Sequence, residues 1–92
     1  MLSVARCPSA SAAEATCQAG DRDCGKRAFN AATKDFDQGS YASALQSFLS
    51  ARAAGAHAII TFNIALCWGH LGKYGQAKLE LQSLLADPRN PP

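Results

Sequence analysis

The sequence predicts an all-α fold of four helices that form two successive helical hairpins. The first observation is an internal repeat, because seven residues of one segment recur 33 positions later. A period of this length is typical of stacked supersecondary units and not of a compact enzyme domain. The second observation is that apolar residues recur at helical spacing between glycines that mark turns. The third is that no stretch shows the alternation of apolar and polar residues that is typical of a β-strand. The recurring residues are Phe29, Asn30, Ala32, Gly39, Tyr41, Ala44 and Ser50, followed by Phe62, Asn63, Ala65, Gly72, Tyr74, Ala77 and Ser83.

The first predicted hairpin joins two helices through a glycine turn. The first helix is expected from about residue 24 to 38, with Asp23 as its N-cap and Gly39 as its left-handed stop. The second helix is expected to start after the N-cap Ser40 and to end at Gly55. Residues at 3.6-residue spacing give this second helix its face: Tyr41, Ala44, Leu45, Phe48, Leu49 and Arg52.

The second predicted hairpin repeats this plan. Its first helix is expected from about 58 to 71 and stops at Gly72. Its second helix is expected from about 75 to 85, because the residue before Pro88 disfavours the helical conformation. Small side chains should let the helices of each hairpin approach at the short end of the 8–10 Å range. The expected facing pairs are Ala32 with Ala44 and Ala65 with Ala77.

Residues 1–23 form a separate N-terminal segment in this interpretation. Residues 9–13 (Ser-Ala-Ser-Ala-Ala) supply the small residues that a signal peptidase prefers, but only residues 1–5 could serve as the preceding apolar stretch. The segment is therefore expected to be either the remnant of a leader or a flexible, partly helical tail. Cys17 and Cys24 flank a turn-like segment and could close a short disulfide loop, or remain two unpaired thiols. These features favour a periplasmic or other extracytoplasmic location, with the cytoplasm as the alternative.

Composition argues against several classes of function. Charged residues make up 17% of the chain, and the formal net charge is +2, so no basic stripe indicates nucleic acid. No run of 18 apolar residues predicts a membrane span. The spacing of Cys67 and His70 could provide half of a zinc site, but no second pair exists. Because the two glutamates, Glu14 and Glu80, lie far from any histidine in sequence and no catalytic motif is present, we expect neither an enzyme nor a cofactor.

The repeated residues resemble the tetratricopeptide repeat. The likeness covers residues 25–90, with one repeat at about 25–57 and the other at about 58–90, within a domain of 24–90. The segments 36–41 and 62–67 look most like repeats from bacterial envelope proteins. The chain departs from the family where Gly55-Ala56-His57 replaces a proline and where Asp35 replaces an aromatic residue. The matching positions are Ala32, Gly39, Tyr41, Ala44, Phe48 and Ala51, then Ala65, Trp68, Gly72, Tyr74, Ala77, Leu81 and Leu84, with Asp87-Pro88-Arg89-Asn90 as the closing turn.

The resemblance implies an α-α superhelix (solenoid) of two helix-turn-helix units, whose first helices line a concave groove for a peptide or partner protein. Asn30 and Asn63 are the best ligand candidates, because an amide can both donate and accept hydrogen bonds. The alternative is that they bond to neighbouring helices. A clamp for a terminal carboxylate is not expected, since Phe29 and Thr33 occupy two of its positions. The implied groove residues are Lys26, Phe29, Asn30, Thr33, Asp37, Phe62, Asn63, Leu66 and His70.

The last predicted helix has more apolar residues than one buried face can use. These are Leu79, Leu81, Leu84 and Leu85. Stacked repeats usually need three or more units, so a further repeat, a second copy in a dimer or a partner helix should cover them. A remote hypothesis is a regulatory appendage of an enzyme whose catalytic part is not in this chain, and two others are favoured. The chain is a scaffold that binds a peptide or protein, or it is a self-associating structural subunit, or a fragment of a longer repeat protein, in an envelope assembly.

Overall fold

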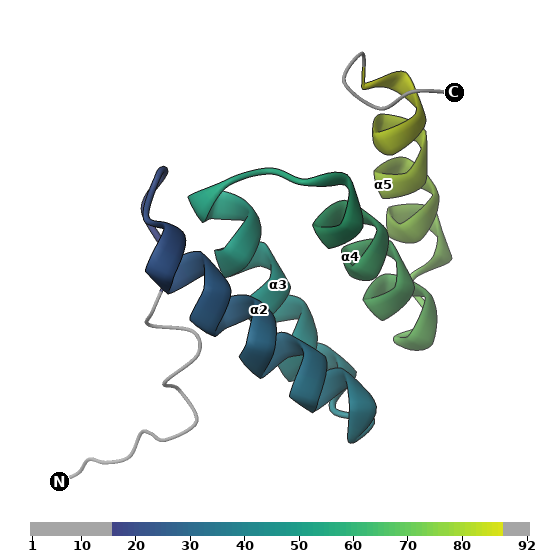
Figure 1. The fold of residues 1–92 in the computed structure, drawn as a ribbon. Helices are drawn as coiled ribbons and strands as arrows, with labels where there is room; N and C mark the ends of the chain where they lie inside the picture. Colours follow the sequence, from purple (N-terminus) through teal and green to yellow (C-terminus); the bar gives the residue numbers. More distant parts are fainter. Residues whose placement is uncertain (1–15, 88–92) are drawn as a thin grey trace, which may run out of the picture.

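The computed structural model describes residues 16–87, which form four α-helices and contain no strand (Figure 1). The helices are α2 (Arg22–Asp37), α3 (Tyr41–Ala54), α4 (Ala58–His70) and α5 (Tyr74–Ala86). Each helix packs on the next one in the chain, so that α2 contacts α3, α3 contacts α4, and α4 contacts α5. This confirms the all-α prediction. The expected leader remnant and the closing turn at 88–90 lie outside the described residues.

The helix ends follow the local signals closely, with one correction. Asp21, and not Asp23, is the N-cap of α2, and its Oδ1 atom accepts a hydrogen bond from the Cys24 N–H at 3.1 Å. Asp23 lies inside the first turn of α2, where its negative charge interacts favourably with the helix dipole, but it does not occupy the N-cap position. Gly39 has a φ of +83°, and Gly72 has a φ of +79°. Both glycines therefore stop a helix in the left-handed conformation, as predicted.

The second N-cap prediction is correct in position but not in chemistry. Ser40 precedes α3, yet its side chain makes no capping hydrogen bond. Instead, Ser43 in the first turn donates a hydrogen bond from Oγ to Asp35 Oδ2 at 2.8 Å. This bond ties the start of α3 to the end of α2. The predicted bounds of α4 and α5 are never more than one residue from the observed ones, which is the usual uncertainty of helix ends.

The core lies where α2, α3 and α4 meet. Ala32 and Ala44 are completely buried, as the close approach of α2 and α3 requires. The second hairpin is looser, because Ala65 is buried but Ala77 is only half-buried. No residue within Tyr74–Ala86 is buried. The core cluster consists of Ala32, Ala44, Leu45, Phe48, Ala51, Ile60, Ile64 and Cys67.

Two contacts connect the hairpins beyond this core. Arg52 on α3 forms a two-pronged ion pair with Glu80 on α5, with Nη1–Oε1 and Nη2–Oε2 distances of 2.7 and 3.2 Å. At the other end of α3, the Tyr41 ring stacks on the ring of His70, the last residue of α4, with 4.1 Å between centroids. The Phe36 ring meets both of these rings edge-on. The hairpins are therefore linked at two separated points.

Candidate binding groove

A cavity of about 360 Å³ opens between the first turns of α2 and α4, above the last turn of α3. Its size falls within the range of pockets that hold small molecules or anchoring side chains. It is formed by three helices and by the loop that joins the two hairpins. The lining residues are Arg22, Gly25, Lys26, Phe29, Ala51, Ala54, Gly55, His57, Ile59 and Ile60.

The floor of the cavity is apolar and belongs to the core. Ala51 and Ile60 are buried, and Phe29 is half-buried. The Phe29 ring contacts the buried Phe48 ring edge-on, with 5.6 Å between centroids. Ile59 forms part of the wall and remains 56% exposed. The cavity therefore presents a packed apolar surface to whatever enters it.

The rim of the cavity is cationic. Arg22 and Lys26 lie one turn apart on α2, and His57 lies in the loop before α4. All three side chains are exposed, and none makes an ion pair or a hydrogen bond with another described residue. Of the described residues that line the cavity, none is acidic. The site thus combines an apolar floor with unpaired positive charge.

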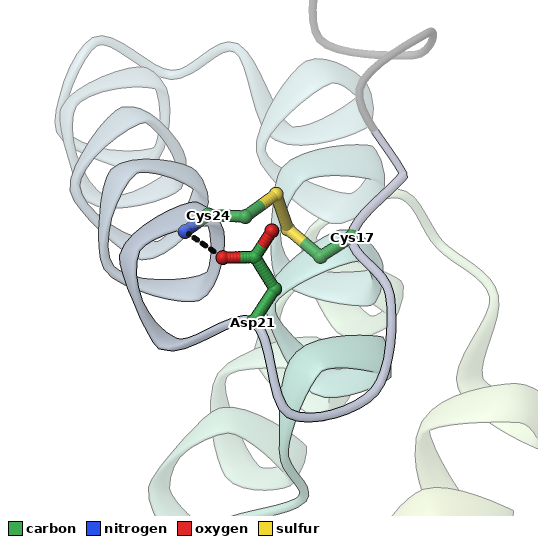
Figure 2. Close-up of a disulfide and its surroundings, with 3 residues drawn as sticks. All are labelled: Cys17, Asp21 and Cys24. Carbon is green, nitrogen blue, oxygen red and sulfur yellow. Dashed lines mark hydrogen bonds between the residues drawn. A yellow bond between two sulfur atoms is a disulfide. The ribbon is translucent and has the colours of Figure 1, made fainter.

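A disulfide between Cys17 and Cys24 positions this end of α2 (Figure 2). It closes the loop that Asp21 also braces by capping the helix. The Gly20 N–H donates to the Ala54 carbonyl at 2.8 Å, which attaches the loop to the end of α3. These three contacts hold the first turn of α2, and hence the cationic rim, against α3. The sequence left the pairing of Cys17 and Cys24 open, and the structure joins them.

The groove residues expected on α2 share one exposed stripe, but only two of them line the cavity. Lys26 and Phe29 do so. Asn30, Thr33 and Asp37 continue along the exposed surface toward the other end of the helix. The Thr33 hydroxyl donates to the Phe29 carbonyl at 2.8 Å, so part of its hydrogen-bonding capacity is used within α2.

The groove residues expected on α4 form an apolar stripe with polar neighbours. Phe62 is 43% exposed and Leu66 is 37% exposed, and with Ile59 they are spaced by three and four residues. Asn63 is half-buried, and within residues 16–87 neither it nor Asn30 has a side-chain hydrogen bond. His70, at the end of the stripe, stacks on Tyr41. We call the exposed stripes of α2 and α4, together with the cavity, the groove surface.

Of the ten described residues that line the cavity, only Lys26 and Phe29 were predicted as groove residues, and the exposed rim and wall residues Arg22, His57 and Ile59 were not. A signal for two of them was present. Arg22 precedes Lys26 by four residues and Ile59 precedes Asn63 by four, so each extends a predicted stripe by one helical turn. Arg22 was overlooked because the predicted start of α2 was two residues too late. His57 lies in a loop, and its place depends on how the two hairpins pack.

The apolar surplus predicted on the last helix is exposed. Leu79, Leu81 and Leu85 are 60%, 39% and 79% exposed, whereas Leu84 is half-buried. Leu81 and Leu85 lie four residues apart on one side of α5, whereas Leu79 points from another side, and we call the exposed pair Leu81 and Leu85 the α5 face. Cys67, by contrast, is fully buried in α4, and burial raises the pKa of its thiol to about 11. It acts as a small apolar core residue.

No protein-family model matches this chain, and neither do the curated proteins or the solved structures. Within residues 16–87 no helix is both long and apolar enough to span a membrane. In the same range, no group of three or more His, Cys, Asp or Glu side chains could hold a metal ion.

Proposed function

We propose that this chain is a tetratricopeptide-like helical scaffold that binds an extended peptide or a protein segment on its groove surface. The observation that carries the proposal is the apolar stripe of Ile59, Phe62 and Leu66, which continues from an apolar cavity and is left uncovered by the packing of α4 on α3 and α5. Exposed apolar side chains arranged in a row beside a cavity are typical of a docking surface. The two hairpins would be its two repeat units.

The expected affinity is modest. Complete burial of a Phe, Leu or Ile side chain contributes about 1.5–3 kcal/mol. The three stripe residues are already 44–63% covered, so each has roughly 1 kcal/mol left to contribute. Association costs several kcal/mol of rotational and translational entropy. Specific binding therefore needs the hydrogen bonds that Asn30 and Asn63 can offer to a peptide backbone, in addition to the stripe.

The proposal is tested with peptides selected from a phage-displayed random dodecapeptide library on the immobilised chain. Phe62→Asp with Leu66→Asp should weaken the selected peptides at least about tenfold, and so should Asn30→Ala with Asn63→Ala. A matched control is Leu79→Asp, which introduces the same side chain at an exposed leucine of α5. Circular dichroism melts verify that the variants fold. If no peptide is selected, or if the groove variants bind as tightly as the control, the proposed function is wrong.

Self-association in an envelope assembly is the second candidate function, favoured by the α5 face. Leu85 is 79% exposed and Leu81, one turn before it, is 39% exposed, so the two leucines form an uncovered apolar strip on a helix that also packs in a hairpin. Sedimentation velocity over a wide concentration range tests this candidate. Leu81→Glu with Leu85→Glu should abolish any dimer, whereas a wild-type chain that stays monomeric at high concentration would exclude it.

An oxidising compartment fits either candidate. The Cys17–Cys24 disulfide holds the start of α2, and disulfides persist mainly outside the reducing cytosol. We therefore propose an extracytoplasmic location, in agreement with the likeness to bacterial envelope repeats. Alkylation of free thiols in intact cells, followed by mass spectrometry, tests it: Cys17 and Cys24 should be protected, and their labelling in the native host would contradict the location.

A further inference from the structure

The cavity at the end of the groove surface combines two chemistries that together define a ligand. We propose that it binds a large aliphatic side chain whose immediate neighbour in the peptide is an aspartate or glutamate. This inference rests on the proposed function and specifies the partner: a segment in which an acidic residue adjoins leucine, isoleucine or methionine.

The preference for an aliphatic side chain follows from the apolar floor of the cavity. Phe29, Ala51 and Ile60 offer only carbon atoms, and Phe29 is held in place by its contact with Phe48. The volume of about 360 Å³ is large compared with the roughly 30 Å³ that one water molecule occupies in the liquid. An apolar side chain that displaces water from this floor gains free energy in proportion to the apolar area that it buries.

The preference for a neighbouring aspartate or glutamate follows from the cationic rim of the cavity. Arg22, Lys26 and His57 surround the apolar floor, and a peptide carboxylate beside the anchored side chain would lie close to them. The Arg22 guanidinium can hold a carboxylate with two parallel hydrogen bonds, and Lys26 adds a second positive charge.

The surroundings of the rim reinforce this preference. The first turn of α4 carries no acidic residue, and its cap position His57 makes no capping hydrogen bond, so the positive end of the helix dipole is not neutralised there. Asp21 and Asp23 flank Arg22 in the sequence, but neither lines the cavity. Asp21 is also engaged as the N-cap.

A basic residue in the same peptide position should be rejected. It would meet two like charges without a carboxylate of the cavity lining to compensate, and like charges at short range cost free energy. The preference should depend on salt, because Arg22 and Lys26 are exposed and the Debye length falls from about 10 Å at 0.1 M to about 3 Å at 1 M.

The test uses three fluorescein-labelled synthetic hexapeptides, Gly-Ser-Leu-X-Gly-Ser with X as aspartate, asparagine or lysine, and NMR titration of the ¹⁵N-labelled chain. The aspartate peptide should bind at least about tenfold tighter than the lysine peptide, with the asparagine peptide between them. Shift changes should concentrate at Lys26, Phe29 and Ile59. The difference should shrink several-fold at 1 M NaCl.

Charge reversal supplies the decisive variant. Arg22→Glu with Lys26→Glu should invert the order, so that the lysine peptide binds best. Acidic residues in the first turns of a helix favour its dipole, so this variant should fold. Lys73→Glu with Lys78→Glu is the matched control: it changes the net charge equally at two exposed positions outside the cavity and should keep the wild-type order.

The outcomes separate this inference from the proposed function. Equal binding of the aspartate and lysine peptides, or an unchanged order after charge reversal, would overturn the inference. If library-selected peptides nevertheless bind the groove surface, the proposed function stands without it. If neither the hexapeptides nor any library peptide binds, both are wrong.

Discussion

Removing the ion pair between Arg52 and Glu80 should loosen the attachment of α5 to the first hairpin. The two side chains meet through two oxygen–nitrogen contacts of 2.7 and 3.2 Å, and they are only 29% and 20% exposed. Arg52 Nη1 also reaches Thr61 Oγ1 at 3.5 Å, so the guanidinium contacts α4 as well. No residue of α5 is fully buried, and while α5 packs on α4, this ion pair joins it directly to α3.

The magnitude lies between two limits. A fully exposed ion pair contributes about 0.2–1 kcal/mol. Two unit charges 4 Å apart attract by about 4 kcal/mol at an effective dielectric constant of 20, but the loss of hydration offsets much of this attraction. Because the Arg52–Glu80 pair is mostly covered and has two parallel hydrogen bonds, we expect a coupling energy of about 1–2 kcal/mol.

A double-mutant cycle of Arg52→Ala, Glu80→Ala and the double variant measures this coupling. The assay is urea unfolding followed by circular dichroism at 222 nm, in low salt. For a domain of this size, each kcal/mol should also move the melting temperature by roughly 4–8 °C. The cycle of Arg52→Ala with Lys73→Ala is the control, since these residues share no contact and should be additive. A coupling below about 0.3 kcal/mol for Arg52–Glu80 would refute the reasoning.

Three further predictions concern the core and the cysteines. Ala44→Phe should lower the free energy of unfolding by about 1–3 kcal/mol, because Ala44 is completely buried and the site would be overpacked. Ala77→Phe should lower it by less, because Ala77 is half-buried. Equal losses in urea unfolding would contradict the packing described. Reduction of the Cys17–Cys24 disulfide, which links residues seven apart, should lower the free energy of unfolding by about 2.5 kcal/mol, because the unfolded chain gains loop entropy. Calorimetry with and without a phosphine reductant measures this loss, and an unchanged melting temperature would contradict the stabilising role of the disulfide. Because the pKa of Cys67 is raised from 9.0 to about 11, unfolding should become easier as the pH rises from 9 to 11, and Cys67→Ala should remove this dependence. Rapid labelling of the folded thiol by Ellman's reagent at pH 8 would disprove its burial.

Some features of the groove surface could be predicted from the sequence because they depend on helical periodicity alone. Lys26 and Asn30, or Phe62 and Leu66, lie four residues apart and must share a face of whatever helix contains them. The cavity could not be predicted in this way. Its rim and walls come from α2, the loop before α4 and α4 itself, and periodicity within one helix does not say which other helix approaches it.

The sequence by itself determined the helical hairpins, their turns and their exposed stripes. Gly39 and Gly72 stop helices because the left-handed conformation is a property of the local chain, and Ala32 and Ala44 permit close contact because they are small. Only the tertiary structure decided that Arg52 reaches Glu80, that the rim and floor of the cavity come together and that the α5 face stays uncovered. The physical reason is that these features depend on relative positions of segments distant along the chain, which arise from the summed packing of all the helices and not from any one stretch of residues.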